Sequence, residues 1–311
     1  MSNNSSFVKR LIFKLVKKHL LASTLNSAVR NVSDLNSKGL HTTITFLNDY
    51  VTDMSKAKYN ANTYMQLFRQ MSKYNLDSSV SLRLSQIGFG IDNGNAMKNL
   101  DQIIGMSERL GIRLWLEAGY SIDSTTLFKV YNTFKAKSKH LGIELPIQFS
   151  IHQSGSNALN AGDTLKLSIY KNTSHLIFDK NLDPKDKKQK QQKAKLPSNQ
   201  DVPMDNEINA ITTLIKKGLK LTLFVHNYNL AVKILKGIKE QKYRKNLIFE
   251  LPLDNYSKKS LKMLKMNKIS VYAPYGKDWI PYAVDRLIDG YIKDIAISIL
   301  NARYAKYNKT K

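Results

Sequence analysis

The amino-acid sequence predicts an α/β fold, namely a (β/α)8 barrel of the TIM type with extra helices at its N-terminus. Short runs of β-branched, leucine and aromatic residues recur eight times after Gly39, and amphipathic helical runs separate most of them. The 311 residues suit a barrel of roughly 250 residues with an addition. A hydrophobic content of 42% is enough for a large buried core. Strands that alternate regularly with helices are the pattern of a parallel barrel.

The predicted strands begin with HTTITFL and end with ISVYA. In chain order they cover residues 41–47, 80–85, 112–117, 146–152, 165–170, 220–226, 246–251 and 269–273. The clearest helices between them cover residues 61–74, 95–110 and 124–140. The helix after the fourth strand is short and rich in Asn and Gly, so distortion of the barrel is expected there.

Residues 1–38 are expected to form an N-terminal helical segment, followed by the barrel over residues 39–302. Within the N-terminal segment, residues 7–21 (FVKRLIFKLVKKHLL) form a basic amphipathic helix whose apolar run is broken by lysines. The lysines exclude a signal-peptide core and a membrane span. The helix is expected to pack on the body of the protein, and an interfacial anchor is the alternative.

The barrel is expected to carry a basic flexible insertion at residues 179–203 and to end in a basic tail at residues 303–311. The insertion begins DKNLDPKDKKQKQQKAKLPSNQ, which holds seven lysines and almost nothing to bury. The net charge of +25 comes largely from lysines spread over helix faces. No nucleic-acid-binding motif is present, so nucleic acid is not expected as the main partner, and peripheral contact with anionic lipid is favoured over it.

The absence of cysteine excludes disulfides, thiolate nucleophiles and cysteine-ligated metals, and it fits a cytoplasmic protein. The six histidines are scattered without metal-ligand spacing, so no metal site is predicted. The glycines between Gly88 and Gly94 lack the spacing of a dinucleotide-binding turn. Glu117 and Glu250 end predicted strands, where two carboxylates would do acid/base work in a barrel hydrolase, and this alternative stays open.

The most informative stretch covers residues 268–290 (KISVYAPYGKDWIPYAVDRLIDG). A β-branched strand leads into a Pro–Tyr–Gly turn, and a helix is expected to start near Asp278 as its N-cap. Polar and aromatic side chains therefore gather where a strand ends and a helix begins, which is where ligands bind in parallel β/α folds.

This stretch resembles the last strand and helix of the proline dehydrogenase family, whose members carry Tyr–x–Pro–x–Gly and, one helix later, Arg–Arg–Leu. The matching residues are Tyr272, Pro274, Gly276, Asp278, Trp279, Pro281, Tyr282, Arg286 and Leu287. The resemblance extends from about Gly39 to Leu300 and implies a barrel that holds FAD at the C-terminal ends of its strands. It further implies hydride transfer from L-proline, or a related cyclic or secondary amine, to the flavin. The product would be Δ1-pyrroline-5-carboxylate, a step of proline catabolism, and the electrons would pass to a quinone.

The resemblance also assigns roles to residues. For the substrate, Arg286 would clamp the proline carboxylate, Arg83 would add a second cation and Tyr272 would pack on the ring, close to Asp285. For the flavin, the matching residues are Gln148 in the fourth strand, the pair His226 and Asn227 after the sixth, and Thr164 and Lys166 in the fifth.

Three positions depart from the family pattern. Asp285 replaces the first arginine of the pair, and Trp115 replaces an aspartate in the third strand. In the fifth strand, TLKLSIY (residues 164–170) replaces Arg–Leu–Val–Lys–Gly–Ala–Tyr, although Lys166 would reach into the site. A carboxylate at Asp285 would repel the proline carboxylate unless an arginine compensates. The alternative to an enzyme is therefore a catalytically degenerate barrel of the same ancestry that acts as a binding or scaffold protein.

Overall fold

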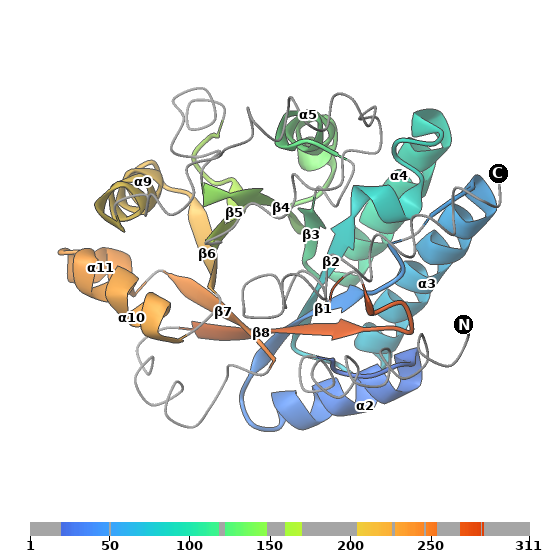
Figure 1. Ribbon diagram of the computed structural model, residues 1–311, viewed down its shortest axis with the longest axis horizontal. Helices are drawn as coiled ribbons and strands as arrows, with labels where there is room; N and C mark the ends of the chain where they lie inside the picture. The colour runs from blue at the N-terminus through green and yellow to red at the C-terminus, as the bar shows by residue number, and fades with distance from the viewer. Residues whose placement is uncertain are drawn as a thin grey trace, which may run out of the picture.

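A computed structural model of the chain describes residues 20–49, 51–117, 122–147, 159–169, 204–225, 228–245, 247–253, 268–280 and 282. Eight parallel strands close into a barrel in which each strand pairs with its neighbours in chain order and β8 pairs with β1. The described helices lie outside the ring of strands (Figure 1). The predicted (β/α)8 barrel is confirmed.

Strand and helix bounds agree with the predictions to within a few residues at most positions. The strands are β1 (His41–Phe46), β2 (Ser78–Arg83), β3 (Leu114–Glu117), β4 (Leu141–Pro146), β5 (Thr164–Ile169), β6 (Lys220–Val225), β7 (Ile248–Pro252) and β8 (Lys268–Tyr275). The α-helices are α2 (Leu25–Asn36), α3 (Met54–Lys73), α4 (Asn93–Leu110), α5 (Ser124–Phe134), α9 (Met204–Lys216), α10 (Tyr228–Gly237) and α11 (Gln241–Arg244). Two 3-10 turns, η2 (Leu84–Ile87) and η3 (Lys135–Lys137), complete the described elements.

The fourth strand was predicted wrongly. Residues 146–152 were expected to form it, but β4 covers Leu141–Pro146 and pairs with β3 through Leu114 and Leu141. The helix before it ends at Phe134 and not at residue 140, so the strand begins correspondingly earlier. The strand was missed because Glu144 lies in its middle. A charged residue in a sequence usually indicates an exposed position, whereas the structure places Glu144 inside the barrel.

The eighth strand is longer than predicted, because it continues through Pro274 to Tyr275. Proline has no N–H to donate to a neighbouring strand. Here β7 pairs with β8 only as far as Tyr272, so no ladder hydrogen bond to β7 is lost at Pro274. Gly276 then ends the strand with a φ of 140°, a conformation that other residues rarely adopt.

The outer face of the barrel is apolar and packs against the helices. Leu, Ile and Val side chains from alternate strand positions form one buried cluster with residues of α2 to α10. Helix α2 precedes the first strand and packs against β1 and β8, with Ala28 and Val32 fully buried. It is the described part of the extra helical segment predicted for residues 1–38.

Three helices that follow strands begin at an aspartate. The side chains of Asp53, Asp92 and Asp123 accept hydrogen bonds from backbone N–H groups in the first turns of α3, α4 and α5. Such caps satisfy donors that have no partner within the helix.

Most of the predicted basic amphipathic helix, residues 7–19 of 7–21, lies outside the described residues. The same is true of the insertion at 179–203 and the tail at 303–311. Leu20 and Leu21, the last two residues of the predicted helix, are described and are not helical. Among the helices that the structure describes, none is both long and apolar enough to cross a bilayer.

Candidate active site

The interior of the barrel is unusually polar. In each strand the alternate residues that point away from the helices include Thr, Ser, Glu, Lys or Arg, where a TIM barrel ordinarily carries Val, Ile and Leu. Buried charges stabilise a fold poorly, since desolvation offsets much of their attraction. A polar barrel interior therefore points to a functional site more than to a structural core.

Lys166 on β5 is the centre of this interior. Its ammonium group lies 2.8 Å from Glu250 Oε2 and 3.3 Å from Glu144 Oε2, and its side chain is fully buried. The hydroxyls of Thr43 and Ser270 donate to the other oxygen of Glu250. Burial alone would lower the pKa of Lys166, but the surrounding carboxylates raise it above its usual value, so Lys166 stays a cation.

Glu144 on β4 is electrostatically distinct from the other glutamates. Burial and the nearby charges of Glu117 and Glu250 raise its pKa to about 8, although Lys166 acts in the opposite direction. Ser168 donates a hydrogen bond to its Oε1. Its Oε2 is buried and lies beside the Lys166 ammonium, but it accepts no hydrogen bond from the described residues. At neutral pH the structure therefore holds this carboxyl largely protonated.

Arg83 ends β2 and connects two carboxylates at the C-terminal end of the barrel. Its guanidinium lies 2.6 Å from Asp49 Oδ2 and 3.2 Å from Glu117 Oε2. Ser81 also donates to Glu117. Burial alone would raise the pKa of Glu117, but Arg83, Lys166 and the Ser81 hydrogen bond together outweigh it, so the pKa is lowered and the carboxylate stays charged. Gln86 of η2 fixes Asp49 through an amide hydrogen bond of 2.9 Å.

Aromatic side chains lie at the same end of the barrel. Tyr272 on β8 packs against Phe224 on β6, with ring centroids 5.2 Å apart, and against Tyr282, at 6.4 Å. Lys166 lies 5.8 Å from the centre of the Tyr272 ring and 4.9 Å from that of Trp115. Burial and the charge of nearby carboxylates raise the pKa of Tyr272 well above its usual value, so the phenol stays neutral.

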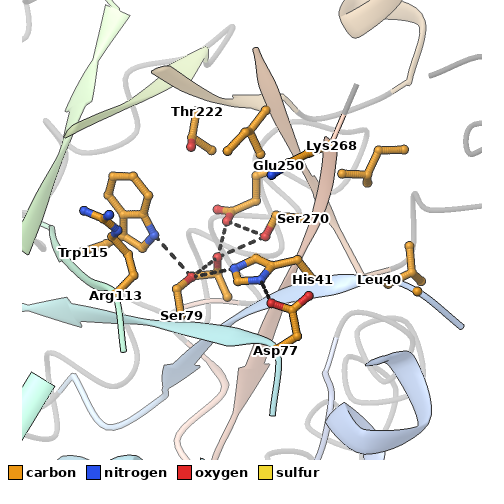
Figure 2. A pocket seen from close by; sticks show the side chains of 14 residues that line it. Leu40, His41, Asp77, Ser79, Arg113, Trp115, Thr222, Glu250, Lys268 and Ser270 are labelled. Carbon is orange, nitrogen blue, oxygen red and sulfur yellow. Dashed lines mark hydrogen bonds and ion pairs between the residues drawn. The ribbon is translucent and has the colours of Figure 1, made fainter. Parts of the chain in front are cut away.

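A cavity opens at the opposite, N-terminal end of the strands. This cavity of about 580 Å³ lies below the polar interior, and Glu250 lies in its wall (Figure 2). At its rim His41 Nδ1 lies 2.8 Å from Asp77, while His41 Nε2 lies 3.4 Å from the Ser79 hydroxyl. Ser79 and Thr43, whose oxygens are 2.9 Å apart, continue this chain of contacts to Glu250. This cavity lies at the N-terminal ends of the strands, whereas the cofactor was expected at their C-terminal ends.

The hydrolase alternative finds no support in this geometry. Both oxygens of Glu250 are held by Lys166, Thr43 and Ser270, and the side chain is fully buried. Glu117 is held by Arg83 and Ser81. Within the described parts of the chain no group of His, Asp and Glu side chains could hold a metal ion.

The structure brings three of the predicted site residues together: Tyr272, Arg83 and Lys166 all point into the barrel. Thr164 does not join them, because it is the first residue of β5 and lies toward the N-terminal end of that strand. Trp115, the replacement in the third strand, fills the interior and donates from its indole to Ser79 at 3.3 Å. The predicted residues Gln148, His226, Asn227, Asp285 and Arg286 lie outside the described part.

The sequence-based prediction missed several members of the polar interior, chiefly Asp49, Glu144, Ser81 and Ser168. One signal was available. In β2 and β5 polar residues recur at every second position between leucines and valines, as in SSVSLR and TLKLSI. In a barrel covered by helices, the apolar face of such a strand turns outward, so the polar face marks the interior.

No protein-family model matches the chain. Among curated proteins, the chain is 22% identical over 270 residues to proline dehydrogenase 2 of Bacillus subtilis strain 168, which covers 85% of this chain and 82% of that protein. It is 23% identical over 282 residues to proline dehydrogenase 1 of the same strain, which covers 88% and 86%. The chain is thus similar to curated proline dehydrogenases over most of its length. This bears out the resemblance seen in the sequence and agrees with the expectation of an oxidoreductase enzyme.

Solved structures support the relationship at the level of the fold. The structure of proline utilization A (PutA) from Bdellovibrio bacteriovorus inactivated by N-propargylglycine matches with a TM-score of 0.70 and 14% identity, over 91% of this chain. PutA from Corynebacterium freiburgense matches with a TM-score of 0.61 and 14% identity, over 92%. The chain spans about a third of each PutA chain, 33% and 32% respectively.

Proposed function

We propose that this relative of the proline dehydrogenases is an FAD-dependent oxidoreductase that takes a hydride from L-proline or a related cyclic or secondary amine. With proline the product would be Δ1-pyrroline-5-carboxylate, a step in proline catabolism, and a quinone would receive the electrons. The observation that carries the proposal is the similarity to two proline dehydrogenases over 85% and 88% of the chain, on a barrel of the same fold.

The described residues fit a flavin ring at the C-terminal end of the barrel. A flavin needs an apolar surface for its ring, hydrogen bonds for its polar edge and a water-poor site. The aromatic cluster of Tyr272, Phe224 and Tyr282 offers the surface. The buried hydroxyl of Tyr228, three residues after the end of β6, has no hydrogen-bond partner among the described residues and would suit the polar edge of a ligand. When bound, the flavin would supply the hydride acceptor.

The flavin contacts proposed from the family resemblance are Gln148, His226 and Asn227. Lys166, the fourth candidate, is fully buried between two glutamates, so we propose that it acts on the flavin through the field of its charge. We no longer favour the fifth candidate, Thr164, because it begins β5 and the flavin would lie at the other end of that strand.

Arg286 is the proposed clamp for the substrate carboxylate, since a guanidinium can bind a carboxylate through two parallel hydrogen bonds. Arg83 and Lys166, the two cations described near the site, already have carboxylate partners. Arg83 pairs with Asp49 and Glu117, and Lys166 pairs with glutamates. We therefore propose that Arg83 contributes to substrate binding mainly by fixing Glu117. Tyr272 would pack on the substrate ring, with Asp285 nearby.

The interior carboxylates would favour the amine end of the substrate. Among described residues the polar interior combines two cations, on Arg83 and Lys166, with four carboxyl groups. Such a site attracts an ammonium group and places it near the aromatic rings, where water is excluded. This is the orientation that hydride transfer from the carbon next to nitrogen requires.

A catalytically silent barrel that serves as a binding or scaffold protein is the second candidate. Trp115 favours it, because a buried indole occupies the interior at the position where the family pattern has an aspartate. A protein of this kind would show no flavin and no reaction with amines, while its fold would be intact.

We also propose that the chain works in the cytoplasm, with peripheral contact at the inner face of the membrane through the basic amphipathic helix at residues 7–21. Lysines beside an apolar stripe would bind anionic lipid. Deleting residues 1–21 should release the protein from anionic liposomes, and equal sedimentation of both forms would contradict the proposal.

The substrate is tested by mixing the purified protein with proline and FAD and identifying the product. Formation of Δ1-pyrroline-5-carboxylate is the expected result, and Arg286→Ala should abolish it by loss of affinity for proline. An unchanged apparent affinity in Arg286→Ala would exclude the clamp. If the protein oxidised pyrrolidine but not proline, the substrate would be an amine that lacks a carboxylate.

A further inference from the structure

Glu144 occupies a position for which neither the family resemblance nor the comparisons assign a role. It projects from β4 into the polar interior, between Glu117 on β3 and the pair Lys166 and Ser168 on β5. Its side chain keeps 11% of its surface exposed, whereas that of Glu250 is fully buried. Its Oε2 is buried and lies 3.3 Å from the Lys166 ammonium, but within the described residues it accepts no hydrogen bond, so this oxygen is held less fully than the oxygens of Glu250.

The groups that face Glu144 come from four neighbouring strands. They are Arg83 from β2 through its hold on Glu117, Glu117 itself from β3, Lys166 and Ser168 from β5, and Glu250 from β7. Tyr272 from β8 also lies within range of the charge of Glu144. Arg83 keeps Glu117 ionised, while burial and the two neighbouring glutamates push the pKa of Glu144 up to about 8. Two adjacent carboxyls with pKa values pushed apart are typical of acid/base sites.

The other described groups around Glu144 are held by partners or kept in one charge state by their surroundings. Lys166 is held as a cation, and the pKa of Tyr272 is raised so that its phenol stays neutral. Glu117 is neutralised by Arg83, and the oxygens of Glu250 are occupied by Lys166, Thr43 and Ser270. A base works best when its pKa lies near the operating pH, and Glu144 meets that condition.

We propose that Glu144 is the proton acceptor for the ammonium group of the amine substrate, an inference that rests on the proposed oxidoreductase function. The N–H bond of the ammonium breaks, and its proton goes to the Glu144 carboxylate. The lone pair left on nitrogen can then form the C=N double bond of an iminium as the neighbouring carbon gives up a hydride with two electrons. A bound oxidised flavin would be the acceptor of that hydride, and one proton stays on Glu144.

The test combines stopped-flow flavin reduction with infrared spectroscopy of the same protein. In the wild type, the rate of flavin reduction by proline or pyrrolidine should rise through a pH of about 8. Glu144→Gln, which mimics the protonated carboxyl, should bind flavin normally, react about 100-fold more slowly or worse, and lose this pH dependence. In the absence of substrate, a carboxylic-acid C=O band should disappear from the wild-type spectrum as the pH passes through about 8, and be missing in Glu144→Gln.

Ser168→Ala is the matched variant that separates a base from a structural residue. The Ser168 hydroxyl stabilises the charged form of Glu144, so its removal should move both the kinetic limb and the infrared transition to higher pH. If Glu144 had a purely structural role, Ser168→Ala would leave the pH dependence of the flavin reduction rate unchanged.

Each outcome has one meaning. If Glu144→Gln reduces its flavin as fast as the wild type with the same pH limb, Glu144 is not the proton acceptor, while the oxidoreductase function stands. If the wild type itself takes up flavin but reacts with no amine, or takes up no flavin, the proposed function fails and the base role fails with it.

Discussion

Glu144→Gln should change the pH dependence of stability in a way that the structure allows to be calculated. A carboxyl whose pKa is raised in the folded state, here from 4.5 to about 8, binds its proton more tightly when folded than when unfolded. Its protonation therefore stabilises the fold fully below pH 4.5, and this contribution is lost as the pH rises through about 8. Each pKa unit corresponds to about 1.4 kcal/mol. The loss amounts to roughly 5 kcal/mol for a rise of about 3.5 units.

The assay is urea denaturation of both proteins at several pH values between 4 and 9, with the free energy of unfolding taken from linear extrapolation. Glutamine cannot ionise, so the variant should gain stability relative to the wild type by about 5 kcal/mol between the two ends of this range. Asp101→Asn removes a half-exposed carboxylate that pairs with Lys137 at the surface, and as a control it should change the curve by no more than about 0.5 kcal/mol. A difference between Glu144→Gln and wild type that stays flat with pH would refute the charge arrangement described for the barrel interior.

Three further substitutions test the packing of the barrel. Lys166→Met leaves Glu250 charged and buried, so urea denaturation should show a loss of about 3–5 kcal/mol, most of it recovered by adding Glu250→Gln; no recovery would contradict the pairing. Gly276→Ala places a Cβ 2.6 Å from a backbone oxygen at a φ of 140°, so the unfolding temperature should fall with a cost of about 1–3 kcal/mol, and an unchanged temperature would count against the turn. Thr43→Val removes a donor from Glu250 and should cost about 1–3 kcal/mol by denaturation, more than Thr45→Val, whose hydroxyl bonds only a backbone carbonyl; equal losses would argue against the link.

The barrel was predictable because its signal is local. Eight apolar runs separated by helical patterns indicate a parallel α/β sheet, and eight is the number of strands in a closed barrel. The eighth strand is followed by a turn that a few residues specify, because Gly276 adopts a positive φ that other residues rarely adopt. The prediction of the fourth strand failed because of its one charged residue, Glu144. This residue is compatible with burial only when Lys166 lies opposite, and the two residues meet only in the folded barrel.

The candidate site was predictable only in part for the same reason. Arg83, Lys166 and Tyr272 were found through their place in a family pattern, and the structure brings them into one interior. Their partners were not found, since Lys166 and Glu250 are 84 residues apart in the chain and meet only when β5 and β7 take their places in the barrel. Asp49 likewise reads as an ordinary loop residue until η2 brings Gln86 beside it.

The visible absorption spectrum of the purified protein tests the central proposal most directly. We expect a flavin band, present on purification or after addition of FAD, that bleaches when proline or another cyclic amine is added without oxygen. A protein that stays colourless after FAD is added would contradict the proposed oxidoreductase and favour the silent barrel.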